Sequence, residues 1–114
     1  MVECAIRLND TSESVNFLND LNKLDRAKIV KIIKKFANVG SIHNKEQFRK
    51  VEGEIWEFKE FQRRIFAYFS GKGCIVLTHG VIKKGNKAKR KEIDKANQIV
   101  IEYAKIRKGF KSEP

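Results

Sequence analysis

The sequence predicts an α+β fold in which an N-terminal helical hairpin packs on a twisted, mostly antiparallel sheet and a C-terminal helix follows. Three observations support this class. Two apolar stripes with helical spacing precede Gly40, strand-like runs fill the middle of the chain, and a third helical stripe lies near its end. Because 114 residues suit one compact domain, we expect a single domain over residues 1–114.

The N-terminal segment predicts a short strand followed by a helix. Residues Val2–Leu8 alternate apolar and polar side chains, which turns the apolar ones, Leu8 included, toward the interior. Asp10 with Glu13 three positions later resembles a capping box and predicts that a helix begins there. The inner face of this helix carries Val15, Leu18 and Leu21.

A break over Asn22–Asp25 separates this helix from a second one, which is expected from about Asp25 to Val39. Gly40 supplies its C-terminal stop, because glycine readily adopts the left-handed conformation that ends many helices. The short connection and the two apolar stripes predict an antiparallel helical hairpin. The stripe of the second helix consists of Ile29, Ile32, Ile33, Phe36 and Ala37.

Four strands are expected in the middle of the chain, because aromatic and β-branched side chains concentrate there. A final helix is expected from about Lys89 to Lys108, ended by Gly109. It carries apolar side chains on one side, from Ile93 to Ala104. The predicted strands are Phe48–Val51, Glu54–Glu60, Arg63–Ser70 and Gly73–Lys83.

Hairpin geometry predicts which side chains share a face of this sheet. With Gly71-Lys72 as a two-residue turn, Arg64 faces His79. With the preceding turn centred on Phe61-Gln62, Lys59 faces Arg64. One face is then apolar and is expected to bury against the helical hairpin. Its members are Trp56, Phe58, Ile65, Ala67, Phe69, Cys74 and Val76.

The other face grades from apolar to cationic. Lys59, Arg64 and His79 form its basic row, with the carboxylate of Glu57 and the ring of Phe66 beside them. Such a set suits a phosphodiester, since cations balance its charge, an aromatic ring stacks on a base, and titratable groups transfer protons.

The net charge narrows the class of partner. Lys and Arg total 25 against 14 acidic residues, which gives +11. A domain this basic is expected to bind an anionic partner, most simply nucleic acid, although acidic partner proteins also fit. The sequence contains neither the apolar run of a signal peptide nor a membrane span, and Cys4 and Cys74 lack metal-binding spacing. We therefore expect a cytoplasmic protein with reduced, packed cysteines.

Three motifs occur in one order along the chain: GEIWEFK at Gly53–Lys59, RIF at Arg64–Phe66 and VLTHGVIKK at Val76–Lys84. Together they closely resemble the phage-derived HigB-type branch of the RelE/ParE toxin superfamily, and Glu92-Ile93 resembles the start of that branch's next helix. The similarity spans about Lys50 to Ala96.

Two positions depart from the pattern of that branch. Lys59 replaces the usual arginine, which keeps the charge but loses the bidentate fork. Ala88-Lys89 stands where the branch often has Thr-Pro, which leaves the shape of that loop open.

The resemblance implies a RelE-like fold and a type II toxin that a cognate antitoxin neutralises, either a HigA-like helix-turn-helix protein or an acidic one. It implies cleavage of messenger RNA in the ribosomal A site, so the ribosome and mRNA are expected partners. It also implies no metal and no cofactor, because the 2′-hydroxyl of the RNA serves as the nucleophile.

Five residues are the candidate catalytic group. Arg64 is expected to contact the scissile phosphate, with Lys59 as a second phosphate contact or proton-transfer group and Lys84 beside them. Glu57 fits two roles, a general base or an ion-pair partner within the sheet. His79 fits a general acid or a structural residue of a buried strand.

A second group is expected to bind RNA more generally. Six of the nine residues from Lys83 to Lys91 are basic, which suits phosphate contacts but also an ordinary solvated surface. Phe66 either stacks on a base or packs in the core. The expected RNA-binding residues are Lys83, Lys87, Lys89, Arg90 and Phe66.

Two other functions fit the same fold. One is a non-enzymatic poison of DNA gyrase of the ParE kind, and the other is an inactive toxin-fold protein that binds only RNA or an antitoxin. The basic row and the lysine-rich loop favour the ribonuclease, because a gyrase poison does not need them.

Overall fold

The computed structural model describes residues 1–40, 44–71, 73–83 and 90–112, with side chains up to residue 108. Within these residues one mixed sheet has the strand order β1-β5-β4-β3-β2, in which β1 is parallel to β5 and the other neighbours are antiparallel. The predicted α+β class and mostly antiparallel sheet are confirmed. The elements are β1 (Val2–Cys4), α1 (Glu13–Asp20), α2 (Lys23–Val39), β2 (Phe48–Glu52), β3 (Ile55–Glu60), β4 (Arg63–Gly71), β5 (Cys74–Ile82) and α3 (Arg90–Ser112).

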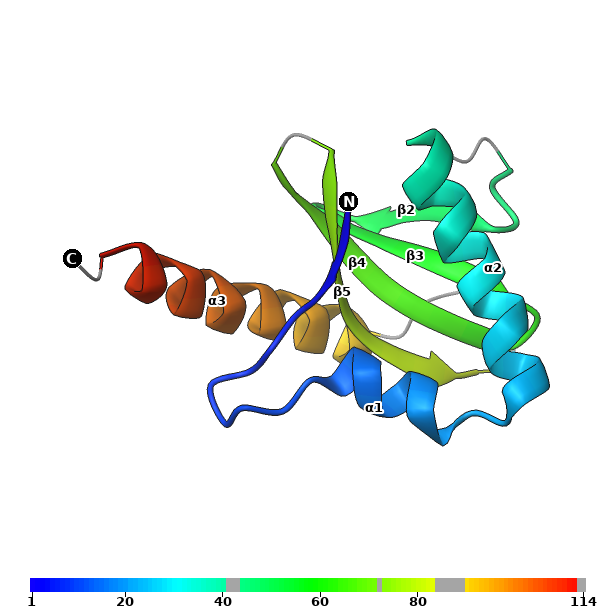
Figure 1. Ribbon diagram of the computed structural model, residues 1–114, viewed down its shortest axis with the longest axis horizontal. Coiled ribbons are helices and arrows are strands. Elements are labelled where there is room, and N and C mark those ends of the chain that lie inside the picture. The colour runs from blue at the N-terminus through cyan, green and yellow to red at the C-terminus, as the bar shows by residue number, and fades with distance from the viewer. Residues whose placement is uncertain (41–43, 72, 84–89, 113–114) are drawn as a thin grey trace.

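Helices cover both faces of the sheet and create two cores. On one face α1 packs against β5 and α2 against β3, whereas α3 contacts β3, β4 and β5 (Figure 1). The far half of α3 extends beyond the sheet (Figure 1). Ile29, Phe36 and Phe58 belong to the core under α1 and α2, and Phe66 and Ile99 belong to the core under α3.

The predicted antiparallel helical hairpin is wrong. β1 precedes the helices, and α1 and α2 run in different directions over different strands (Figure 1). The connection is fixed by Arg26, whose guanidinium donates to the carbonyls of Leu18 at 2.8 Å and Leu21 at 3.0 Å. These bonds satisfy carbonyls at the end of α1 and hold the bend between the helices.

Both ends of α2 agree with the sequence analysis, whereas the end of α3 does not. Asn22 caps α2 by accepting a hydrogen bond from the Asp25 N–H at 2.8 Å, and Gly40 has a φ of 83°. α3 continues through Gly109 to Ser112, because one glycine costs a helix about 1 kcal/mol without ending it.

The predicted N-terminal strand is too long. β1 ends at Cys4, and Ile6 and Leu8 are exposed rather than turned inward. The predicted capping box does not form, because Asp10 adopts a left-handed conformation at φ 67° and α1 begins only after Ser12. Cys4 lies half-buried as a free thiol, and so does the other cysteine, as predicted.

An ionic clamp explains why the chain leaves the sheet at this point. The guanidinium of Arg7 bonds Glu102 of α3 at 2.7 and 3.1 Å and also contacts Glu13 of α1. The N–H of Leu8 donates to Glu102 at 3.0 Å, and these bonds lower the pKa of Glu102 to about 2. Because this clamp links α1 to α3, it ties the helices on opposite faces of the sheet together.

The predicted β3–β4 register is confirmed and the β4–β5 register is wrong. Lys59 pairs with Arg64 as expected. At the other hairpin Gly71 pairs with Cys74, not Ser70 with Gly73, so the start of β5 is shifted. Ile75 and Leu77 therefore face α1 and α2, whereas Cys74 and Val76 were expected there and pack beneath α3.

A second irregularity returns the end of β5 to the predicted face. Phe66 pairs with His79 and Ala67 with Leu77, so Thr78 is an extra residue on β5. The hydroxyl of Thr78 donates to the carbonyl of Phe66 at 3.1 Å and stabilises this bulge. His79 thus lies opposite Phe66, and the predicted pairing of His79 with Arg64 is wrong.

Gly80 gives a test of how tightly α1 packs on β5. A Cβ at this position would lie 2.3 Å from the ring of Phe17. We expect Gly80→Ala to lower the free energy of unfolding by about 1–3 kcal/mol, the usual cost of overpacking, in urea denaturation. In a Phe17→Ala background the same change should cost much less. Equal costs in both backgrounds would contradict the contact.

Candidate functional site

Basic side chains from all four antiparallel strands gather near the turn that joins β3 to β4. Arg49 of β2 lies opposite Glu57, and Lys59 lies opposite Arg64. Lys83 follows β5, and its N–H donates to the carbonyl of Gln62 in the turn at 2.8 Å. We call these four basic residues, Arg49, Lys59, Arg64 and Lys83, the cationic cluster.

Glu57 is the carboxylate at the centre of the cationic cluster. Its side chain is fully buried, and its Oε1 accepts a hydrogen bond from Nε of Arg49 at 2.8 Å. Nε of Arg64 lies 4.0 Å from the same oxygen. Its other oxygen, Oε2, has no hydrogen-bond partner among the described residues. The geometry therefore favours the ion-pair role of Glu57 over the general base.

Arg64, the expected phosphate contact, lies inside the fold. Only 2% of the residue is exposed, and its Nη1 donates to the carbonyls of Phe61 at 2.6 Å and Arg63 at 3.1 Å. Burial lowers the pKa of Arg64, the attraction of Glu57 opposes this shift, and the charge of Arg49 adds to it. Arg64 nevertheless stays protonated, as arginine does in proteins.

Lys59 and Arg49 form the accessible rim of the cluster. The side chain of Lys59 is 14% exposed and that of Arg49 is 34% exposed. Nζ of Lys59 lies 3.5 Å from Oε2 of Glu46, whose side chain is exposed. An exposed ion pair of this kind contributes little stability, so an incoming anion can replace Glu46.

His79 and Phe66 belong to the core beneath α3. Their rings stack with centroids 5.0 Å apart, and both residues are almost fully buried. His79 also contacts Thr78 at 3.2 Å and Glu92 of α3 at 3.3 Å. Burial and the charge of Lys95 lower the pKa of His79, so its ring is neutral at pH 7. Both residues therefore take the structural roles that the sequence left open.

The remaining predicted residues do not join the cluster in the part of the chain that is described. Arg90 is exposed and pairs with Glu52, and its Nε lies 3.6 Å from Asp94. Glu52 lies opposite Ile55, four positions along β3 from Lys59. Lys84, Lys87 and Lys89 lie outside the described residues.

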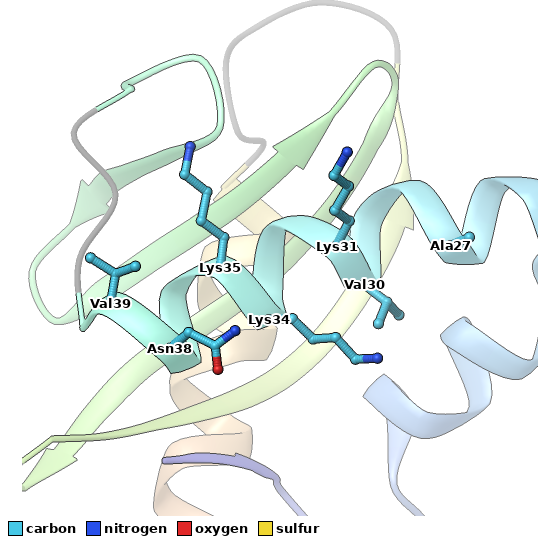
Figure 2. Close-up of a pocket in the computed structure, with 7 residues that line it drawn as sticks. All are labelled: Ala27, Val30, Lys31, Lys34, Lys35, Asn38 and Val39. Carbon is cyan, nitrogen blue, oxygen red and sulfur yellow. The ribbon is translucent and has the colours of Figure 1, made fainter.

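A second basic surface lies on α2. Lys31 and Lys35 project from one side of the helix and Lys34 from another, around a shallow depression that also includes Val30 and Val39 (Figure 2). No acidic side chain lines it. This surface suits phosphate-backbone contacts, and it lacks the carboxylate and the buried arginine of the cationic cluster.

The described residues do not form a metal site. Among residues 1–40, 44–71, 73–83 and 90–112, no three His, Cys, Asp or Glu side chains lie together as a metal would require. No helix in this part of the chain is long and apolar enough to cross a bilayer.

A mixed sheet between two helices on one face and one long helix on the other, with basic residues at one end, defines a class of small, basic α+β proteins. The model of the phage-derived Gp49-like protein family (DUF891) matches residues 16–100, so the chain belongs to this family. The family is RelE-like and is associated with the toxins of toxin–antitoxin systems, which implies an antitoxin partner. No curated protein gave a significant match.

Sequence reasoning missed Arg49 and the turn residue Phe61. Arg49 lies in a strand that was predicted, but its pairing with β3 was not, because a bulge between Lys50 and Glu52 shifts that register. The alternation of Phe48 and Arg49 was the available signal, since it places Arg49 on the face away from the aromatic core.

The buried His79 predicts a pH dependence of stability. In the unfolded chain a histidine binds a proton near pH 6.5, whereas His79 in the folded chain does so only at lower pH. The free energy of unfolding should therefore fall as the pH drops below 6.5, by at most about 1.4 kcal/mol per pH unit. Urea denaturation between pH 7 and pH 5 measures this slope.

The matched variant is His79→Gln, in which the slope should be smaller. The other histidine of the chain, His43, is present in both proteins and cancels in the comparison. Equal slopes in the two proteins would contradict a buried, neutral His79.

Proposed function

We propose that this chain is a HigB-type toxin of a type II toxin–antitoxin system and that it cleaves mRNA on the ribosome without a metal ion. The cationic cluster carries this proposal, because Arg49 and Arg64 flank one buried carboxylate beside Lys59, and a net charge of +11 favours an RNA partner. The association of the family with toxins supports the biological role.

The proposed reaction is an internal transesterification of RNA. The 2′-oxygen attacks the adjacent phosphorus and loses its proton to water, and the bond from phosphorus to the 5′-oxygen breaks. The products are a 2′,3′-cyclic phosphate and a 5′-hydroxyl. Cations stabilise this reaction because negative charge builds up on the phosphoryl oxygens in the transition state.

Four residues of the site have a role in this proposal. Lys59 and Arg49 contact the scissile phosphate, since both side chains are partly exposed. The ammonium of Lys59 also gives a proton to the leaving 5′-oxygen. Arg64 and Glu57 lie deeper. Glu57 holds Arg49 in position, and Arg64 holds the β3–β4 turn and adds positive potential at the phosphate.

The same basic surface suits the expected antitoxin, an acidic or helix-turn-helix protein. The gyrase poison and the inactive binding protein remain the alternatives, and both predict that the parent protein does not cleave mRNA.

Ribosomes programmed with a defined mRNA test the enzyme. The purified chain should produce new 5′ ends within the A-site codon, mapped by primer extension, and none without ribosomes. Lys59→Ala and Arg49→Ala should each lower kcat/KM by roughly 10²–10³-fold, as removal of one transition-state donor does. Lys105→Ala, an exposed lysine of α3, is the charge-matched control and should retain activity.

Unchanged cleavage by the Lys59 and Arg49 variants would show that the site lies elsewhere. Protein that arrests growth but leaves no cuts would contradict the ribonuclease, and a DNA supercoiling assay with gyrase would then test the rival function.

A further inference from the structure

Phe61 is an aromatic side chain whose placement the fold does not require. It lies at the tip of the β3–β4 turn and is 70% exposed, so it contributes little to either core. Its φ of 53° is in the left-handed region, which an aromatic residue rarely adopts. Glycine or asparagine would fit this turn with less strain, so the position keeps an aromatic ring at a cost to stability.

The turn is attached to the cationic cluster and to α2 by two arginines. Nη1 of Arg64 donates to the carbonyl of Phe61 at 2.6 Å, which links the turn directly to the buried charges. The guanidinium of Arg63 lies over the ring, 5.8 Å from its centroid. Arg63 is itself held by Glu60 at 2.7 Å and by Asp25 of α2 at 3.4 Å. The backbone of the turn is therefore held in place before any ligand binds, with the guanidinium of Arg63 over the ring.

We propose that Phe61 is a stacking platform for an unpaired nucleobase of the single-stranded RNA whose phosphate Lys59 and Arg49 bind. This inference rests on the proposed function. Every nucleobase has a flat π-face, so one exposed ring can bind many sequences. Proteins that bind single-stranded nucleic acid commonly combine an aromatic ring, on which a base stacks, with basic side chains that contact the phosphates.

The surroundings of Phe61 favour RNA over a protein partner. The turn and the strand ends beside it carry mainly polar or basic side chains, and both nearby acids, Glu60 and Asp25, are engaged by Arg63. Ile82 is the exposed apolar exception. A protein-docking patch would instead be continuous and apolar at its centre.

The test uses variants that separate stacking from strain. Phe61→Leu keeps an apolar side chain but has no π-face. Phe61→Asn also removes the ring, yet asparagine tolerates the left-handed conformation, so this variant should be at least as stable as the parent protein. Phe61→Trp keeps stacking and supplies an exposed fluorophore. Ile101→Ala, on the surface of α3, controls for the loss of exposed apolar area.

Two measurements are made on the full chain. The first is the affinity for a single-stranded RNA oligonucleotide that 2′-O-methyl groups make uncleavable. The second is cleavage of programmed ribosomes at limiting enzyme. Phe61→Leu and Phe61→Asn should weaken RNA binding roughly 5- to 150-fold and lower kcat/KM comparably, as loss of one stacked base does. RNA should quench the fluorescence of Phe61→Trp, and Ile101→Ala should behave as wild type.

The outcomes separate this inference from the proposed function. If the wild-type chain cuts mRNA and the Leu and Asn variants cut and bind equally well, stacking is wrong and the ribonuclease stands. If the wild-type chain does not cut, the ribonuclease is wrong, and the oligonucleotide affinities still decide whether Phe61 stacks.

Discussion

The buried carboxylate of Glu57 is the constraint on which the candidate site depends. Glu57 lies on strand β3, between β2 and β4, and its side chain faces Arg49 of β2 and Arg64 of β4. Charges in such an environment must be paired, and removal of one partner of a buried pair typically costs about 3–5 kcal/mol. Glu57 therefore keeps two arginines within the sheet. Through the bond from Arg64 to Phe61 it also fixes the turn where the strands end.

This arrangement divides the molecule into a reactive end and a supporting body. The ionic clamp around Arg7 and Glu102 holds the helices on the two faces together, and the stacked pair of Phe66 and His79 fills the space beneath α3. Phe66 also lies directly opposite Glu57, so this packing supports the cationic cluster from the same face of the sheet. The accessible charge of the cluster comes from Lys59 and Arg49 at its rim, which is why we assign phosphate contact to them and a positioning role to Arg64.

Periodicity predicted the α+β class, the apolar stripe of α2, its stop at Gly40 and the pairing of Lys59 with Arg64, because these depend on local spacing. The β4–β5 pairing failed because the register depends on where bulges occur. The shifted hairpin end near Gly71 and the extra residue Thr78 each move His79 by one position along β4. The choice between stacking and core packing for Phe66 could not be made from the sequence, since alternation shows which face a residue shares but not that the distant helix α3 covers it. The pairing of Arg49 with Glu57 was missed for a similar reason, because a bulge between Lys50 and Glu52 shifts the register of β2 and β3.

The central claim is that RNA binds at the cationic cluster and not at the lysines of α2. An NMR titration with an uncleavable 2′-O-methyl RNA tests it most directly, because the side-chain Nε–H of arginine and the ammonium of lysine report on phosphate contact. If RNA binds at the cationic cluster, the largest chemical-shift changes fall on Arg49 and Lys59, with smaller changes at Lys31, Lys34 and Lys35. Shifts concentrated on the α2 lysines, with Arg49 and Lys59 unchanged, would contradict it.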